Sequence, residues 1–290
     1  MRLAPVHSAL LALALAGSGC QHLGKAPSQG ERAQAAAEVT RAWAAADSPL
    51  LAAAVDGEWR TRSFRARDSH RHPRETLEFF NVGSRSRVVE ISPGAGWYSE
   101  ILGPYLRNSG TYFVAMPAAA ADSAGGRRNA GLKNRFAADP ARYDRVQWLE
   151  YDAAAPEFGA PGSADVVLTF RNVHNWVAAD TAAAYFKAFH DVLKPGGVLG
   201  VVDHRARPGT SLETMKKSGY LTEELVIGLA TAAGFRLEAS SEVNANPRDT
   251  TDHPNGVWTL FPTARHPARD AARYRTIGES DRMTLRFVKP

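Results

Sequence analysis

Apolar runs rich in Val, Ile, Leu, Phe and Tyr alternate with helix-like segments along the chain from about residue 76 onwards. The helical period is clearest where Tyr98, Ile101, Leu102 and Tyr105 recur at spacings of three and four. This alternation predicts an α/β fold with a mostly parallel sheet and helices on both faces. The expected strands are 87–91, 111–116, 146–151, 165–170, 198–203, 236–243 and 283–288.

Capping residues locate one further helix, over residues 222–233. Thr222 fits the N-cap, Glu223 and Glu224 fall in the first turn, and Gly234 is a typical terminator. Residues 75–80 predict another, short helix. The arginine-rich stretch 50–75 predicts irregular structure, and the segment 244–281 reads as a long loop.

The first twenty residues have the pattern of an export signal. Arg2 precedes an apolar segment over residues 8–16, which is shorter than the roughly 20 residues that a membrane-spanning helix needs. Cys20 stands where a bacterial lipoprotein signal places its lipidated residue, and ordinary cleavage after Ala16 is the alternative. We therefore expect a signal peptide over 1–20, a tether and helical or irregular cap over 21–75, and the main domain over 76–290.

Composition narrows the possible partners. The 290 residues include 44% hydrophobic and 22% charged residues, which is ordinary for a globular protein. The net charge of +5 comes from scattered arginines, so no nucleic-acid-binding surface is expected. With one cysteine, no internal disulfide can form.

The stretch VVEISPGAGWY, residues 88–98, predicts a buried strand that enters a glycine-rich turn. Such a turn exposes backbone N–H groups to a ligand, and glycines allow the ligand to approach closely. A dinucleotide fingerprint counted from Gly94 places Ser99 at its third glycine, which argues against a nicotinamide or flavin site. A tight turn without a ligand is the alternative.

The same turn, read as acid-x-G-x-G-x-G, resembles the first motif of class I S-adenosylmethionine (SAM) methyltransferases, with Ser92 at the first glycine. The segments VQWLEYDA, FHDVLKPGGVLGVVDH, LTEELVIGLATAAGFRLE and RMTLRFVKP resemble later parts of that fold. The order of RHPRETLEFF, ISPGAGWYSEILGPYL and FRNVHNW is similar to a poorly characterised bacterial group of predicted exported methyltransferases.

The resemblance implies a Rossmann-like seven-stranded sheet with an antiparallel last strand, an N-terminal helical extension, and SAM as cofactor. It also implies the residues that hold the cofactor: Glu90, Ser92, Gly94, Gly96, Asp152, Arg171 and Asn172. In this family an acid usually ends the second strand and binds the ribose. Here that strand ends Met116-Pro117, with Asp122 some residues later, which predicts weaker cofactor binding.

His174, after the fourth strand, is the candidate general base. Its HNW context resembles the His-Asp-Trp of small-molecule O-methyltransferases, but Asn175 takes the place of the carboxylate. Neutral imidazole suits proton abstraction near neutral pH. A residue that only lines the pocket is the alternative. The other candidates for the substrate pocket are Trp97, Tyr98, Asn175, Trp176, Asp203 and His204.

A metal site is not expected. Asp68, His70 and His72 are spaced by two on an irregular segment, which is a weak metal signal. Arg67, Asp68, Arg71 and His72 fit better as a polar cap over the pocket or as a solvated surface.

These patterns favour an exported, periplasmic methyltransferase that acts on a small molecule, with no contact to membranes other than a lipid anchor at Cys20. The alternative is a non-catalytic protein of the cell envelope that uses the same fold to bind a ligand. Export favours the alternative, because SAM is made in the cytoplasm.

Overall fold

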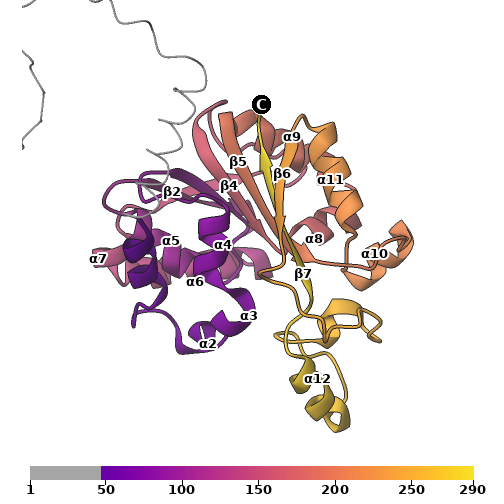
Figure 1. Ribbon diagram of the computed structural model, residues 1–290. Coiled ribbons are helices and arrows are strands. Elements are labelled where there is room, and N and C mark those ends of the chain that lie inside the picture. Colours follow the sequence, from indigo (N-terminus) through magenta and orange to yellow (C-terminus); the bar gives the residue numbers. More distant parts are fainter. Residues whose placement is uncertain (1–46) are drawn as a thin grey trace, which may run out of the picture. The chain divides into compact units, whose positions relative to one another are not determined.

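The computed structural model describes residues 47–290 (Figure 1). Cys20, the expected signal peptide, the tether and the first part of the expected cap lie outside the described residues. Seven strands form one sheet in the order β3-β2-β1-β4-β5-β7-β6. The strands are β1 (Arg87–Ile91), β2 (Thr111–Pro117), β3 (Gln147–Tyr151), β4 (Ala164–Phe170), β5 (Leu193–His204), β6 (Arg236–Ser241) and β7 (Arg282–Val288).

The expected sheet is confirmed. The strands from β1 to β5 pair in parallel, and β7 runs antiparallel between β5 and β6. β5 begins earlier than predicted, because Leu193 pairs with Ala164 across a β-bulge instead of ending a helix. β6 ends earlier than predicted, at Ser241, whose side chain accepts a hydrogen bond from the Val243 backbone.

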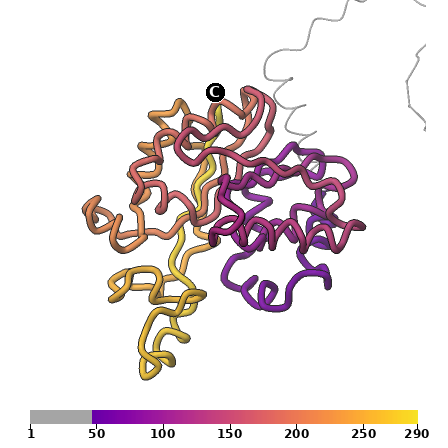
Figure 2. The backbone as a smooth tube through the Cα atoms, turned by 180° about the vertical axis from the view of Figure 1, so that it is seen from behind, coloured from indigo at the N-terminus to yellow at the C-terminus, as the bar shows by residue number. Residues whose placement is uncertain are grey.

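Helices on the two faces of the sheet enclose two separate apolar cores (Figures 1 and 2). One core includes Phe186 and Phe189, and the other includes Leu77, Ile101 and Leu102. The α-helices after β1 are α5 (Ser99–Leu106), α6 (Ala124–Ala137), α7 (Pro140–Tyr143), α8 (Val173–Ala178), α9 (Ala182–Val192), α10 (Leu212–Ser218), α11 (Glu223–Ala232) and α12 (Ala271–Ile277). Within residues 47–290, none is long and apolar enough to span a bilayer.

Capping of α11 follows the sequence. The Thr222 hydroxyl accepts a hydrogen bond from the Leu225 backbone N–H at 3.2 Å, which fixes the helix start. Gly234, two residues past the helix, has a φ of +100° that suits glycine.

The segment before β1 is more helical than predicted. Residues 47–55 form a helix, followed by α2 (Arg62–Arg65), α3 (Asp68–Arg71) and α4 (Pro73–Phe79). Helices of four residues are too short to show a helical period, which explains the wrong prediction for 50–75. Leu51, in the first of these helices, is buried in the same core as α5.

The segment 244–281 also contains more structure than predicted. It holds two short 3₁₀ helices, η1 (Gly256–Thr259) and η2 (Ala268–Asp270), besides α12. Three-residue and four-residue 3₁₀ turns carry no extended periodicity, so the sequence pattern did not predict them.

Candidate functional site

The glycine turn after β1 has the backbone that its sequence suggests. Ser92, Gly94 and Gly96 have φ values of +48°, +62° and +79°. A Cβ built on Gly94, which is exposed, would meet nothing within 4 Å, so a ligand can approach this backbone. A Cβ on Gly96 would lie 2.5 Å from Leu132 Cδ1 of α6. Gly96 is therefore required by packing of the chain's own helix.

Glu90 is buried inside β1 and is bound by the protein itself. Its Oε2 accepts hydrogen bonds from Ser99 Oγ at 2.7 Å and from the Tyr112 hydroxyl. Burial raises the pKa of Glu90 to about 7, although both hydrogen bonds lower it. The carboxyl group therefore serves to join β1, β2 and the start of α5.

The raised pKa predicts how stability depends on pH. The unfolded chain loses the Glu90 proton above about pH 4.5, and the folded chain keeps it to about pH 7. Stability from this group is therefore full below pH 4.5 and falls by about 3 kcal/mol as pH rises through 7. Glutamine cannot ionise. The free energy of unfolding of Glu90→Gln, relative to that of wild type, should therefore rise by about 3 kcal/mol from pH 4 to pH 8.

Urea unfolding of both proteins at the two pH values checks this expectation, with exposed Glu150→Gln as the control. Identical pH dependence of Glu90→Gln and wild type would contradict it.

The ends of β2 and β3 lie beside the glycine turn. Ser92 Oγ and the Tyr151 hydroxyl are 2.7 Å apart, which links the turn to the end of β3 across the end of β2. Asp152 is exposed, and its Oδ1 accepts a hydrogen bond from the Ala154 backbone at 2.9 Å. Asp122 is also exposed and lies in the segment between β2 and α6.

Trp97 and Tyr98 are both buried by contacts within the chain. Trp97 Nε1 donates to the Phe64 carbonyl at 3.0 Å, and the Arg71 guanidinium lies 4.8 Å from the indole centroid. Tyr98 stacks on Phe170 with ring centroids 3.6 Å apart. These contacts hold the N-terminal helices against α5.

Some of the residues that follow β4 pack inside the protein, and others are open to solvent. Asn172 Nδ2 donates to the Ile91 carbonyl at 2.9 Å, which ties β4 to the end of β1. Trp176 is buried and stacks on Tyr185, with centroids 4.1 Å apart. Asn175 is exposed. Arg171 has a φ of +61° and lines a small cavity between β4, β5 and β7.

His174 has a carboxylate partner that its sequence neighbours do not provide. Its Nδ1 lies 2.9 Å from Asp203 Oδ1, and the Asp203 side chain is fully buried. The parallel pairing of Phe170 with Val202 brings the residues after both strands together. Asp203 accepts the Nδ1 proton, so Nε2 of neutral His174 is left as a proton acceptor.

His204 completes a polar cluster with this pair. Its ring centroid is 5.0 Å from that of His174, and its Nδ1 lies 2.6 Å from Ser280 Oγ. Burial lowers the pKa of His204 far below its usual value, and His174, Arg171, Arg282 and Arg71 lower it further. His204 is therefore neutral.

Among the described residues, this cluster is the one group of three that could hold a metal ion. Ligand atoms of His174, Asp203 and His204 lie within 4.8 Å of one another. The same arginines that lower the pKa of His204 also repel a cation, which argues against a resident metal ion. Asp68, considered above with His70 and His72, is instead paired with Arg60 at 2.6 Å.

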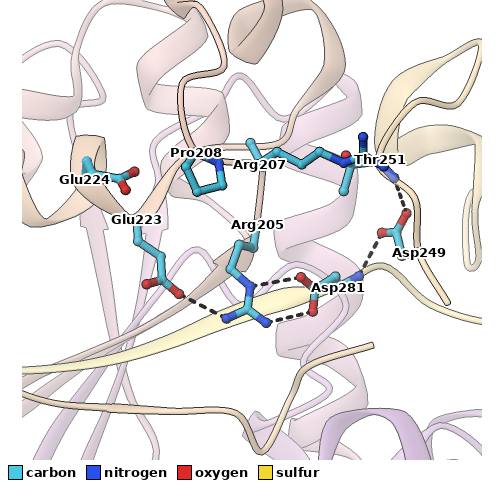
Figure 3. Close-up of a pocket in the computed structure, with 9 residues that line it drawn as sticks. Arg205, Arg207, Pro208, Glu223, Glu224, Asp249, Thr251 and Asp281 are labelled. Carbon is cyan, nitrogen blue, oxygen red and sulfur yellow. Dashed lines mark hydrogen bonds and ion pairs between the residues drawn. The ribbon is translucent and has the colours of Figure 1, made fainter. Parts of the chain in front are cut away.

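A larger cavity, of about 360 Å³, lies beyond the end of β5 (Figure 3). Arg205 crosses it and binds Asp281 and Glu223, and hydrogen bonds to Glu242 and Asp281 raise its pKa. Asp249 accepts from the Asp281 backbone at 2.8 Å and from the Tyr220 hydroxyl at 2.9 Å. These interactions fasten the 244–281 segment to β5 and α11.

Sequence reasoning missed Glu279 and Arg282. Glu279 is buried and binds Arg67, Arg71 and Arg282, at distances of 2.5, 3.1 and 3.1 Å. Arg67 and Arg71 were expected only as a polar cap or solvated surface. No local signal could reveal the pairing of Glu279 with Arg71, because 208 residues separate them.

No family model matches the chain, and no curated protein matches it. Solved structures do. A SAM-dependent methyltransferase from Aquifex aeolicus is 14% identical with a TM-score of 0.52, over 78% of this chain and 93% of that one. The cyclase SpnF is 17% identical with a TM-score of 0.52, over 76% and 81%. At these identities the likeness shows a Rossmann-like methyltransferase fold and no more. SpnF is a cyclase, so the same fold also supports a different reaction.

Proposed function

We propose that the protein is a SAM-dependent methyltransferase that acts on a hydroxyl group of a small molecule. The observation that carries this proposal is the His174–Asp203 pair at the ends of β4 and β5. In doubly wound sheets, ligands bind beyond the carboxyl ends of the strands. The pair therefore lies at the edge where the open glycine turn also ends β1.

The chain's residues fit the cofactor at two places. The exposed Gly94 backbone, with open space where a Cβ would stand, suits close approach of the nucleoside. The exposed Asp152 carboxylate would accept hydrogen bonds from the adenine amino group of the cofactor. The end of β2 provides no acid for the ribose, so the Ser92 and Tyr151 hydroxyls are the nearest donors. We therefore expect micromolar affinity or weaker.

SAM supplies an activated methyl group on a sulfonium, so the protein has to align the acceptor and remove a proton. Asp203 holds His174 in the tautomer that leaves Nε2 free. His174 Nε2 would accept the proton of the substrate hydroxyl, whose oxygen would take the methyl group as the methyl–sulfur bond breaks. Asp203 then stabilises the imidazolium, because it is buried and hydrogen-bonded to the ring.

Gly94→Val tests whether the turn holds the cofactor. Its methyl groups would occupy the space that is open above the turn, so SAM affinity of the full chain should fall at least about 100-fold. Gly162→Val is the matched control. Gly162 also has a φ of +62° and nothing within 4 Å, but it precedes β4 at the opposite sheet end.

Calorimetric titration of wild type and both variants with SAM makes the comparison. Equal affinity in Gly94→Val and wild type would show that the cofactor does not bind at this turn.

A non-catalytic ligand-binding protein is the second candidate. The end of β2, at Met116-Pro117, has no acid to bind the ribose of SAM, which favours it. Absence of heat on titration with millimolar SAM would support this candidate and contradict the methyltransferase.

A further inference from the structure

Three arginines from distant parts of the chain line a small cavity that is partly open to solvent. We name Arg71, Arg171 and Arg282, with the space between them, the arginine cavity. It measures about 10 Å³, room for one water-sized group, and is also lined by Tyr98, Phe170, Val202 and Asn244. Arg71 and Arg282 are each 3% exposed.

Positive charge in this region exceeds negative charge. Glu279 is shared by Arg67, Arg71 and Arg282. Burial alone would raise the pKa of Glu279, but Arg282, Arg71 and Arg67 lower it to about 2, so it is ionised. Asp203, the other nearby carboxylate, is bound to His174. One shared carboxylate therefore balances three arginines, and Arg171 adds a further charge.

Donor groups in the cavity lack acceptors. Among the described residues, Arg71 Nη2 and Arg282 Nε are buried without a hydrogen-bond partner. The Arg171 side chain forms no hydrogen bond or ion pair with residues 47–290, although its backbone N–H donates to the Val202 carbonyl at 2.7 Å, and burial lowers its pKa to about 10. Unpaired buried donors are costly, and a bound anion would satisfy them.

We propose that the arginine cavity binds a carboxylate group of the substrate, and that the enzyme therefore acts on hydroxylated carboxylic acids. This proposal rests on the proposed function. The space admits one carboxylate oxygen, whereas a phosphate group is too large. Phe170 and Arg171 are only half-buried, so the cavity is not sealed from solvent.

Position assigns the carboxylate to the substrate instead of the cofactor. Most residues lining the cavity come from or follow β4, β5, β6 and β7, and the others are Arg71 of α3 and Tyr98 at the start of α5. Asp152, expected to bind the adenine, follows β3 at the edge of the sheet, whereas the glycine turn follows β1, which is the neighbour of β4. His174 lies shortly after Arg171 in the chain, and its partner Asp203 directly follows Val202 of the cavity lining. A carboxylate held there would place the rest of the substrate close to His174.

The larger cavity beyond β5 is a weaker candidate for binding a carboxylate, because several of its charged side chains are already paired with one another. Figure 3 shows Arg205 bound by Asp281 and Glu223, and Glu242 binds it as well. Asp249 is bound by His253 and Tyr220. A ligand would have to displace these interactions, whereas the arginine cavity offers donors that are already free.

Arg171→Met tests the proposal, because removing the Arg171 side chain breaks no ion pair or side-chain hydrogen bond among the described residues. The full chain, in chloride-free buffer, is titrated with benzoate and with uncharged benzamide while its melting temperature is followed. In wild type, benzoate should raise the melting temperature and benzamide should not. In Arg171→Met, benzoate affinity should fall at least about 10-fold. Arg107→Met, which removes a partly exposed arginine paired with Asp144 and remote from the cavity lining, is the matched control.

Without ligand, Arg171→Met should melt about 2–4 °C higher than wild type, because it removes a like charge from beside Arg282. A merely structural arginine would give the opposite sign. Arg171→Gln repeats the test with a polar side chain. Equal responses to benzoate and benzamide, or unchanged benzoate affinity in both variants, would overturn the proposal.

Titration with S-adenosylhomocysteine and methylthioadenosine separates the two sources of a carboxylate. Of these two ligands, only S-adenosylhomocysteine carries a carboxylate. If Arg171→Met lowers the affinity for S-adenosylhomocysteine but not for methylthioadenosine, the cavity binds the cofactor and the substrate assignment is wrong. Unchanged affinity for both supports it. Failure of wild type to bind either nucleoside, with benzoate binding retained, would refute the proposed methyltransferase function but not the carboxylate site.

Discussion

Replacing Glu279 by glutamine is expected to lower the free energy of unfolding by about 3–5 kcal/mol. Glu279 is 3% exposed and is the only carboxylate that binds Arg71 and Arg282 within residues 47–290. A neutral amide would leave these buried arginines without a counter-charge, and they repel one another at short range. Urea unfolding at pH 7 measures the loss.

The double variant Glu279→Gln with Arg171→Met provides the control. Removing one positive charge should recover part of the lost stability, since the two sites act on the same cluster. Arg171→Met should gain more stability in the Glu279→Gln background than in wild type, and an equal or smaller gain there would contradict this account of the cluster.

The same carboxylate predicts acid sensitivity. Its pKa is about 2 in the folded chain and about 4.5 in an ordinary environment. The unfolded chain takes up this proton first, so the stability from Glu279 is full above pH 4.5 and is lost as pH falls towards 2.

Asp203→Asn is expected to lower turnover by about 10²–10⁴-fold while SAM affinity stays the same. The amide would donate to Nδ1 of His174, so the proton would move to Nε2, and the imidazole could no longer accept from the substrate. Asp203 contacts the base but not the substrate, so its role is to position and polarise His174.

Nitrogen NMR of the imidazole can test this without a substrate. Wild type should carry the proton on Nδ1, and Asp203→Asn should carry it on Nε2. Asp165→Asn, at the amino end of β4, is the matched control and should leave the tautomer unchanged. An Nε2 proton in the wild-type protein would contradict the proposed base.

Local patterns predicted most of the fold. The period of α5, the cap of α11 and the seven strands are set by residues within a few positions of one another, so they are visible in the sequence. The motif around Gly94 likewise predicted a tight turn after the first strand, and the turn is present, with positive φ at Ser92, Gly94 and Gly96. Short helices such as α2 and α3 were missed, because four residues cannot express a helical period.

The polar interior was not visible in the sequence, because its pairs are distant along the chain. His174 and Asp203 are 29 residues apart and meet through the pairing of β4 with β5. Asn175, in the position where a carboxylate was sought, is exposed. Glu279 and Arg71 meet only through the complete fold. Glu90 was expected to hold the cofactor, and its side chain is bound by Ser99 and Tyr112.

The most direct measurement is a crystal structure of the full chain with S-adenosylhomocysteine. Our account predicts the nucleoside against the Gly94 backbone and near Asp152, with the sulfur on the side of His174 Nε2. Density for the nucleoside at another place, or a ligand-free turn with the Ser92–Tyr151 hydrogen bond intact at saturating ligand, would contradict the proposed methyltransferase.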